Sequence, residues 1–121
     1  MLLLSQILVS LVALEHLYIL WLEMFAWETQ GKKTFRGALK EDLFAPTKVL
    51  AANQGLYNGF LAAGLIWSFF ISDPHWSRSV ALFFLGCVAV AGLYGGATAS
   101  KRIFLVQAMP AILAFLVTLM R

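Results

Sequence analysis

Three ionisable side chains lie inside a long apolar stretch near the start of the chain. Glu15, His16 and Glu23 interrupt the apolar segment 3–27. A charged group at the centre of a membrane helix costs on the order of 2.5 to 3.5 kcal/mol on insertion scales, so such groups usually face a bundle interior and find a partner. At about 100° per residue all three fall on one helix face. We therefore expect a polar site along this face that binds a ligand or handles protons.

The composition of the whole chain is that of a membrane protein. Of the 121 residues, 61% are hydrophobic and 12% are charged, whereas charged residues make up about 25% of soluble domains. Four apolar segments approach the roughly 20 residues that cross a bilayer core: 3–27, 48–71, 79–99 and 102–120. None alternates with period two as barrel strands do. We predict an all-α integral membrane four-helix transmembrane bundle, a single domain over residues 1–121.

The distribution of basic residues predicts the orientation of the chain. The connection 28–48 holds five Lys or Arg residues and the turn 100–102 holds two, against Arg78 and Arg121 on the other side. By the positive-inside rule we expect a multi-pass protein of the bacterial inner (cytoplasmic) membrane with both termini outside. The first segment lacks a basic n-region, which favours a retained span over a signal peptide. Because the basic residues lie beside helix ends, we expect no nucleic-acid partner.

Polar residues of all four segments fall at similar depths in this arrangement. Counted inward at about 1.5 Å per residue, five lie roughly 6 to 10 Å from the cytoplasmic ends: Glu23, Asn53, Gln54, Tyr94 and Gln107. Glu15, His16 and Asn58 lie deeper, at roughly 15 to 18 Å by the same rise, and Tyr57 shares a helix face with Asn53. We expect one cavity open to the cytoplasm, with Glu15, His16 and Asn58 as its floor.

Two other readings of these residues remain. The first is a hydrogen-bond network that only locks the helices together, although interhelical bonds average about 0.6 kcal/mol and two carboxyls with a histidine are costly to bury for so little. The second, a metal site, is not expected, because Glu15 and His16 project about 100° apart and no His-x-x-x-His pair exists. Cys87, the sole cysteine, is interpreted as a packing residue, and His75 as a solvated loop residue.

The connection 28–47 is the longest polar stretch. Its Gly31 and the following lysine pair predict a turn. Four later residues recur at near-helical spacing and are expected on the membrane surface: Phe35, Leu39, Leu43 and Phe44. Lys32, Lys33 and Arg36 are expected to anchor the segment, and binding of a nucleotide or lipid headgroup is the alternative.

Small residues and prolines predict where the helices approach closely or bend. Gly55, Gly59 and Ala63 share one face of segment 48–71, which is typical of tight helix packing. Residues 72–78 predict a short connection with a proline turn. Pro110 predicts a local kink in the last segment.

Two long runs carry a family resemblance. Residues 15–27 (EHLYILWLEMFAW) and 51–64 (AANQGLYNGFLAAG), with the Tyr94-Gly95 and Gln107–Pro110 regions, resemble a small bacterial membrane family known as domain of unknown function thirteen-hundred-and-four. This resemblance implies a four-helix integral membrane protein, and it implies no reaction, substrate or cofactor. Small multidrug resistance transporters are similar only in length and in the position of Glu15.

The sequence thus predicts a cytoplasm-facing intramembrane polar site for a small or lipophilic ligand. The residues expected to bind it or to handle protons are Glu15, His16, Glu23, Asn53, Gln54, Tyr57, Asn58, Tyr94 and Gln107. The expected partners are the lipid bilayer and such a ligand, with a homo-oligomer as an option. A proton-coupled exporter, a membrane-embedded enzyme acting on a lipophilic substrate, and a structural or partner-binding subunit are the alternatives. Whether the protein is an enzyme, and which cofactor it uses, stay open.

Overall fold

The computed structural model describes residues 1–121, and nearly all of them outside one connection are helical. The elements in chain order are α1 (Leu2–Phe25), α2 (Gln30–Thr34), the 3-10 helix η1 (Glu41–Leu43), α3 (Lys48–Phe69), α4 (Pro74–Thr98), α5 (Lys101–Ile103), the π-helix η2 (Phe104–Ala108) and α6 (Met109–Leu119). Because α5, η2 and α6 follow one another without a break, we call them together the C-terminal rod. The predicted all-α class is confirmed.

Three helices are long and apolar enough to cross a membrane, namely α1, α4 and the C-terminal rod. At 22 residues α3 is of similar length, but its amide side chains and glycines lower its hydropathy. By length and composition the structure therefore supports three membrane-spanning helices, one fewer than the sequence predicts.

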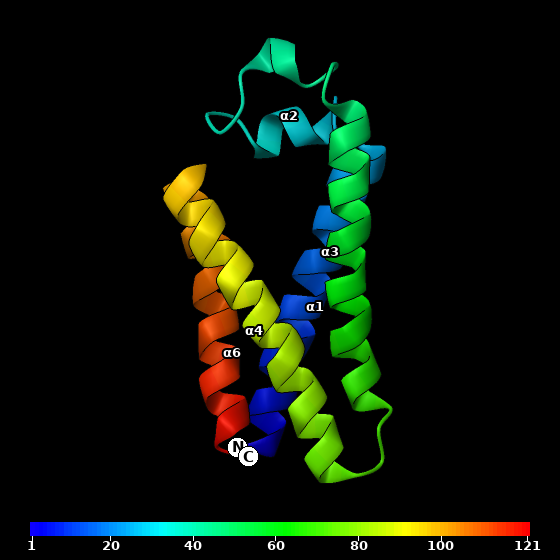
Figure 1. The fold of residues 1–121 in the computed structure, drawn as a ribbon, viewed down its shortest axis with the longest axis vertical. Helices are drawn as coiled ribbons and strands as arrows, with labels where there is room; N and C mark the ends of the chain where they lie inside the picture. The colour runs from blue at the N-terminus through cyan, green and yellow to red at the C-terminus, as the bar shows by residue number, and fades with distance from the viewer.

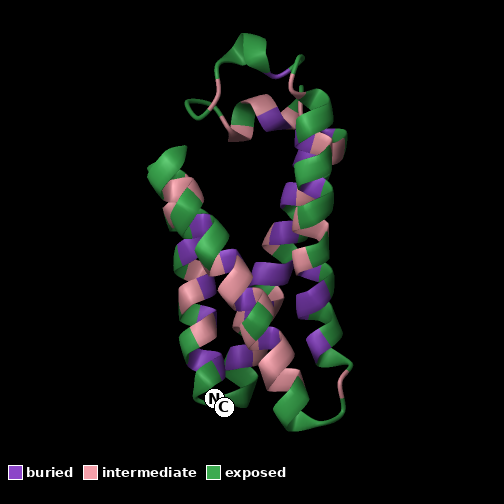
Figure 2. Ribbon diagram, in the orientation of Figure 1, coloured by how far each residue is buried: buried purple, intermediate pink, exposed green.

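The long helices pack together at one end of the molecule and diverge at the other. Figure 1 shows the two termini side by side at the packed end, while α3 separates from α4 and α6 toward the end that carries α2. The hydrophobic core joins α1, α3, α4 and α6 in the packed half, where Figure 2 shows buried positions on these helices. Its members are Val9, Val12, Ala13, Leu65, Leu85, Val88, Ala111 and Ala114.

Helix α1 crosses from one side of the molecule to the other. Near its start, the Oγ of Ser5 lies 2.7 Å from the Oγ1 of Thr118 in α6. Near its end, the Cγ of Met24 lies 2.8 Å from where a Cβ on Gly55 of α3 would stand, and Leu20 lies against Gly59 in the same way. The predicted packing role of these two glycines is therefore confirmed. As a result, α1 joins the α3 side to the α4 and α6 side.

The start of α4 differs from the prediction. Residues 74–78 are helical rather than part of a proline turn, because Asp73 caps the helix. Its Oδ1 accepts hydrogen bonds from the backbone N–H groups of His75 at 2.8 Å and Trp76 at 3.1 Å. Pro74 takes the first helical position, where its missing N–H and fixed φ suit the helix.

The connection between α1 and α3 also differs from the prediction. The turn expected at Gly31 and the lysine pair is wrong, because these residues form α2. Gly31 is buried, and its N–H donates to the carbonyl of Ala26 at 2.7 Å, so α2 packs directly onto the end of α1. The chain turns instead at Gly37, whose φ of 89° favours glycine.

Only the short η1 forms in the part of this connection where near-helical spacing was expected. Aromatic contacts hold the segment instead. The ring of Trp27 lies 5.5 Å from that of Phe35 and 4.8 Å from that of Phe44, centroid to centroid. The indole N–H of Trp27 also donates to the Oγ1 of Thr47 at 3.1 Å. The connection is thus a folded cap over the divergent end.

Pro110 coincides with a change in helix type, as the predicted kink suggested. The five residues of η2 precede it in a π-helix. Pro110 has no N–H to donate to the preceding turn, and a π-helical turn is one way to accommodate that loss. Gln107 lies within this widened turn. Single π-helical turns within α-helices occur frequently at functional sites.

Candidate functional site

A cavity of about 120 Å³ lies where α1, the cap and the start of the C-terminal rod meet. Its polar lining residues are Glu15, Tyr18, Thr34, Arg36, Ser100, Arg102 and Gln107. Its apolar lining includes Ile19, Leu22, Phe35, Ile103 and Val106. A cavity of this size has room for several water molecules or for one small polar group.

Glu15 and Gln107 are the two predicted site residues that line this cavity together. They come from facing elements, Glu15 from the middle of α1 and Gln107 from the π-helical turn η2. The carboxyl of Glu15 has no hydrogen bond or ion pair within the protein, since the single ion pair of the chain joins Lys48 to Glu28 at 3.8 Å. Both side chains are half-buried and therefore accessible to a ligand in the cavity.

Two arginines line the same cavity from different elements. Arg36 belongs to the cap, and Arg102 to the start of the C-terminal rod. Neither guanidinium donates a hydrogen bond to another group of the protein, and neither has a carboxylate within 4 Å. Each is exposed. The sequence associated Arg36 with anchoring or headgroup binding and Arg102 with orientation, whereas the fold brings them to one cavity.

Glu23 and Asn58 form a separate pair at the interface of α1 with α3. The Nδ2 of Asn58 donates to the Oε1 of Glu23 at 2.6 Å, and Glu23 is only 4% exposed. Counting from helix ends predicted that Asn58 lies deeper than Glu23, and the contacts agree, since Gly55 packs on Glu23 and Met24 while Gly59, next to Asn58, packs on Leu20. The two side chains are nevertheless within hydrogen-bond reach, because the helices are staggered and α3 extends past the end of α1 (Figure 1).

His16 lies apart from Glu15 although the two are neighbours in sequence. Its ring is 1% exposed, and its Nδ1 forms a 2.9 Å hydrogen bond with the carbonyl of Val12 one turn earlier. The helix directs the two side chains about 100° apart. In this structure His16 therefore does not share a cavity floor with Glu15 and Asn58.

Four predicted site residues face away from the cavity: Asn53, Gln54, Tyr57 and Tyr94. All four are exposed, and the amide of Asn53 donates to the carbonyl of Val49 in its own helix at 2.9 Å. The two faces predicted for this helix do exist. The glycine face of α3 packs on α1, and of the amide face only Asn58 reaches another helix, through its hydrogen bond to Glu23, while Asn53, Gln54 and Tyr57 stay exposed.

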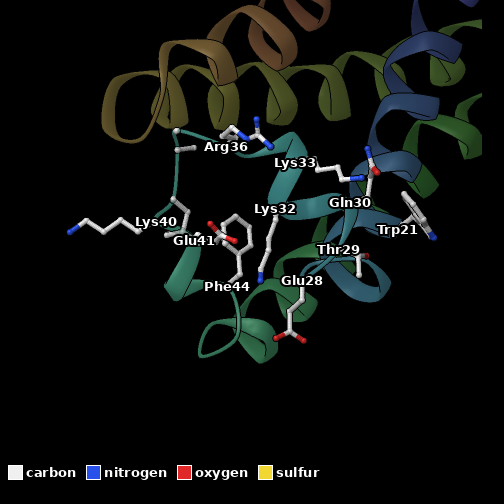
Figure 3. A pocket seen from close by; sticks show the side chains of 13 residues that line it. Trp21, Glu28, Thr29, Gln30, Lys32, Lys33, Arg36, Lys40, Glu41 and Phe44 are labelled. Atoms are coloured by element: carbon white, nitrogen blue, oxygen red, sulfur yellow. The ribbon is translucent and has the colours of Figure 1, made fainter.

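A second hollow, of about 890 Å³, lies on the outer surface of the cap. Its charged lining residues are Lys32, Lys33, Lys40, Glu28, Glu41 and Arg36, the last of which also lines the smaller cavity. Figure 3 shows the lysine side chains pointing in different directions, with the carboxylates lying among them. The three lysine side chains therefore do not converge on one point.

Sequence reasoning missed a polar cluster that closes the packed end. Arg121 donates to the Oγ of Ser5 at 3.2 Å and to the Oγ of Ser77 at 3.1 Å, and Ser77 donates to the carbonyl of Ser68 at 2.7 Å. The four long helical rods are thereby tied together. Burial, with the nearby positive charge of Arg78, lowers the pKa of Arg121. Hydroxyl residues near the ends of apolar segments are the signal that could have indicated this cluster.

Residues 10–119 match the family described as "Protein of unknown function (DUF1304)". This chain belongs to the DUF1304 family. A DUF1304 relative is the uncharacterized protein YpaA of Lactococcus lactis subsp. lactis, which is 39% identical over 117 residues, or 96% of this chain and 97% of that protein. No solved structure matches the chain. The predicted resemblance is confirmed.

Proposed function

We propose that this DUF1304 protein is a four-span protein of the bacterial cytoplasmic membrane that binds a small, partly apolar ligand in the cavity beside Glu15. The observation that carries the proposal is the lining of this cavity. Unpaired polar groups and apolar side chains meet there, between helices that are otherwise apolar. Ionisable groups inside membrane helices usually mark functional sites.

Two features support α3 as the fourth span. It is 22 residues long, about the length needed to cross the hydrocarbon core, and it packs along α1 through Gly55 and Gly59. The two termini also lie at the same end of the molecule (Figure 1), which agrees with an even number of crossings. The basic residues of the cap favour its location in the cytoplasm, with both termini outside.

The closed end of the molecule favours binding over transport in this conformation. An exporter needs access to its site from both sides of the membrane. The side chains of Ser5, Thr118 and Arg121 bond to one another at the packed end, and the core of buried apolar residues lies between them and the cavity. Access from the cap end agrees with the exposed Arg36 and Arg102 that line the cavity there.

Native mass spectrometry tests the proposal on protein released gently from its membranes. Wild type is expected to carry a small bound species. Val106→Trp fills the cavity from the π-helical turn and is expected to lose that species. Leu116→Trp adds the same side chain at an exposed position of α6 outside the cavity and is expected to keep it. The proposal is contradicted if Val106→Trp retains the bound species at the wild-type level. It is also contradicted if the wild-type protein carries no bound species.

A further inference from the structure

We infer that the ligand of this cavity is a membrane amphiphile with an anionic head, held between Arg36 and Arg102. This assignment deepens the proposed function and depends on it. The shared chemistry is an oxyanion joined to an apolar tail, whether the phosphate of an anionic phospholipid or the carboxylate of a fatty acid.

The two arginines of the cavity favour a ligand whose head group is negatively charged. Arg36 and Arg102 approach from the cap and from the C-terminal rod, and neither has an acidic partner within the protein. A guanidinium presents a planar fork of donors that matches carboxylate and phosphate oxygens. Basic pockets between membrane helices on the cytoplasmic side bind lipid headgroups. An anion between these two side chains would satisfy donors that the fold leaves free.

The volume of the cavity determines how much of the ligand enters. Pockets that enclose a drug-sized molecule measure about 300 to 1,000 Å³, and this cavity measures about 120 Å³. It can hold a headgroup but not a whole ligand. The remainder must stay outside, and an amphiphile with its tail in the bilayer meets that condition without exposing apolar surface to water.

The apolar wall of the cavity continues onto the outer surface. Val106 lines the cavity and is 45% exposed, and Tyr18 beside it is 47% exposed. Helices α1 and the C-terminal rod are both apolar enough to lie in a membrane, so this surface would meet acyl chains. An alkyl tail could therefore leave the cavity along Val106 without crossing a polar barrier.

Glu15 and Gln107 then fix the orientation of the head. An ionised Glu15 would repel an anion, so the head is expected at the arginine end of the cavity rather than beside the carboxyl. The amide of Gln107 can donate to an ester or carbonyl oxygen, and the carboxyl of Glu15 can accept from a hydroxyl next to the head. The outer hollow of the cap shares Arg36 with the cavity, but Arg102 does not line it, and its lysines diverge and lie among Glu28 and Glu41 (Figure 3).

Purified protein in a non-ionic detergent provides the test, with the midpoint of thermal unfolding measured against lipid concentration. The probes are phosphatidylglycerol, oleate and zwitterionic phosphatidylcholine. Arg36→Gln combined with Arg102→Gln is expected to weaken the apparent affinity for the anionic probe at least tenfold. The control combines Lys32→Gln with Lys40→Gln, which removes the same charge from the outer hollow, and is expected to bind as wild type does.

The probes separate the two sources of the anion. Stabilisation by phosphatidylglycerol identifies a phospholipid phosphate, and stabilisation by oleate alone identifies a carboxylate. Equal stabilisation by phosphatidylcholine, or equal loss in both double variants, overturns the inference. Binding of the probes to Val106→Trp shows whether only the anionic head is wrong or the cavity itself is not the binding site. If Val106→Trp abolishes binding and the arginine variant does not, the cavity is the site and the anionic head is wrong; if Val106→Trp binds normally, the cavity itself is wrong.

Discussion

Two carboxyls on one helix have different surroundings in this protein. Glu15 lines a cavity and has no partner within the chain, whereas Glu23 is buried and accepts a hydrogen bond from Asn58. A partnered, buried side chain is typical of a structural role. An unpartnered one beside a cavity is typical of a ligand site. The pair of Glu23 and Asn58 is thus a counterpart of the locking network expected as an alternative, whereas the cavity beside Glu15 is where we propose the ligand site.

The pair of Glu23 and Asn58 is expected to stabilise the contact of α1 with α3. Asn58→Ala removes the donor and leaves a buried carboxyl without a partner, which costs about 1 to 3 kcal/mol. A lower midpoint of thermal unfolding in detergent would reveal this loss. Asn53→Ala is the matched control, because the amide of Asn53 is exposed and bonds to its own helix. Equal midpoints for the two variants would show that the pair contributes nothing measurable.

At the scale of elements, glycines set how closely the helices approach. A Cβ on Gly92 of α4 would stand 2.6 Å from the backbone nitrogen of Ala108 in η2, which is too close for any methyl group. A Cβ on Gly86, two turns earlier, would meet only Phe115, at 3.8 Å. Close packing at Gly92 holds α4 against the π-helical turn, and that turn carries two of the residues that line the cavity, Val106 and Gln107.

Gly92→Ala is therefore expected to separate α4 from η2 and to lower stability by roughly 1 to 3 kcal/mol, as overpacking does. Gly86→Ala is expected to leave stability unchanged or to raise it by about 0.5 to 1 kcal/mol, since alanine is the better helix former. Thermal unfolding of both variants in one detergent measures the difference. Unfolding of Gly92→Ala at or above the unfolding temperature of Gly86→Ala would contradict a close contact between α4 and η2 at this glycine.

At the scale of the whole molecule, one end is locked and the other is open. The packed end holds both termini, the apolar core and the hydrogen bonds of Arg121. The divergent end carries the cap, most of the basic residues and the cavity. The proposed ligand site therefore lies at the opposite end of the molecule from the polar cluster around Arg121.

Cysteine labelling in intact cells tests the proposed orientation. Cys87 is first replaced by alanine to remove background. A cysteine at exposed Lys40 in the cap is expected to be shielded from an impermeant thiol reagent, and one at exposed His75 near the start of α4 is expected to react. Labelling of permeabilised cells controls for accessibility of both sites. The reversed pattern would place the cap outside the cell and refute the orientation.

The sequence alone determined the helical class, the rough bounds of the four long rods and the family. These follow from local properties: runs of apolar residues about 20 long, polar connections, and motifs contiguous in the chain. It also singled out Glu15 and Gln107, because a carboxyl and an amide are uncommon in such runs. The bounds at the start of α4 were misplaced, since the capping role of Asp73 was not recognised.

Only the tertiary structure decided which polar residues meet. A helical wheel gives the direction of each side chain relative to its own helix, but not which face a neighbouring helix covers. The glycine face of α3 packs on α1, which leaves Asn53 and Tyr57 on the outside. The stagger of α3 against α1 pairs Asn58 with Glu23, and the fold of the cap brings Arg36 to the same cavity as Arg102. These placements depend on contacts between residues far apart in the chain, which no local pattern records.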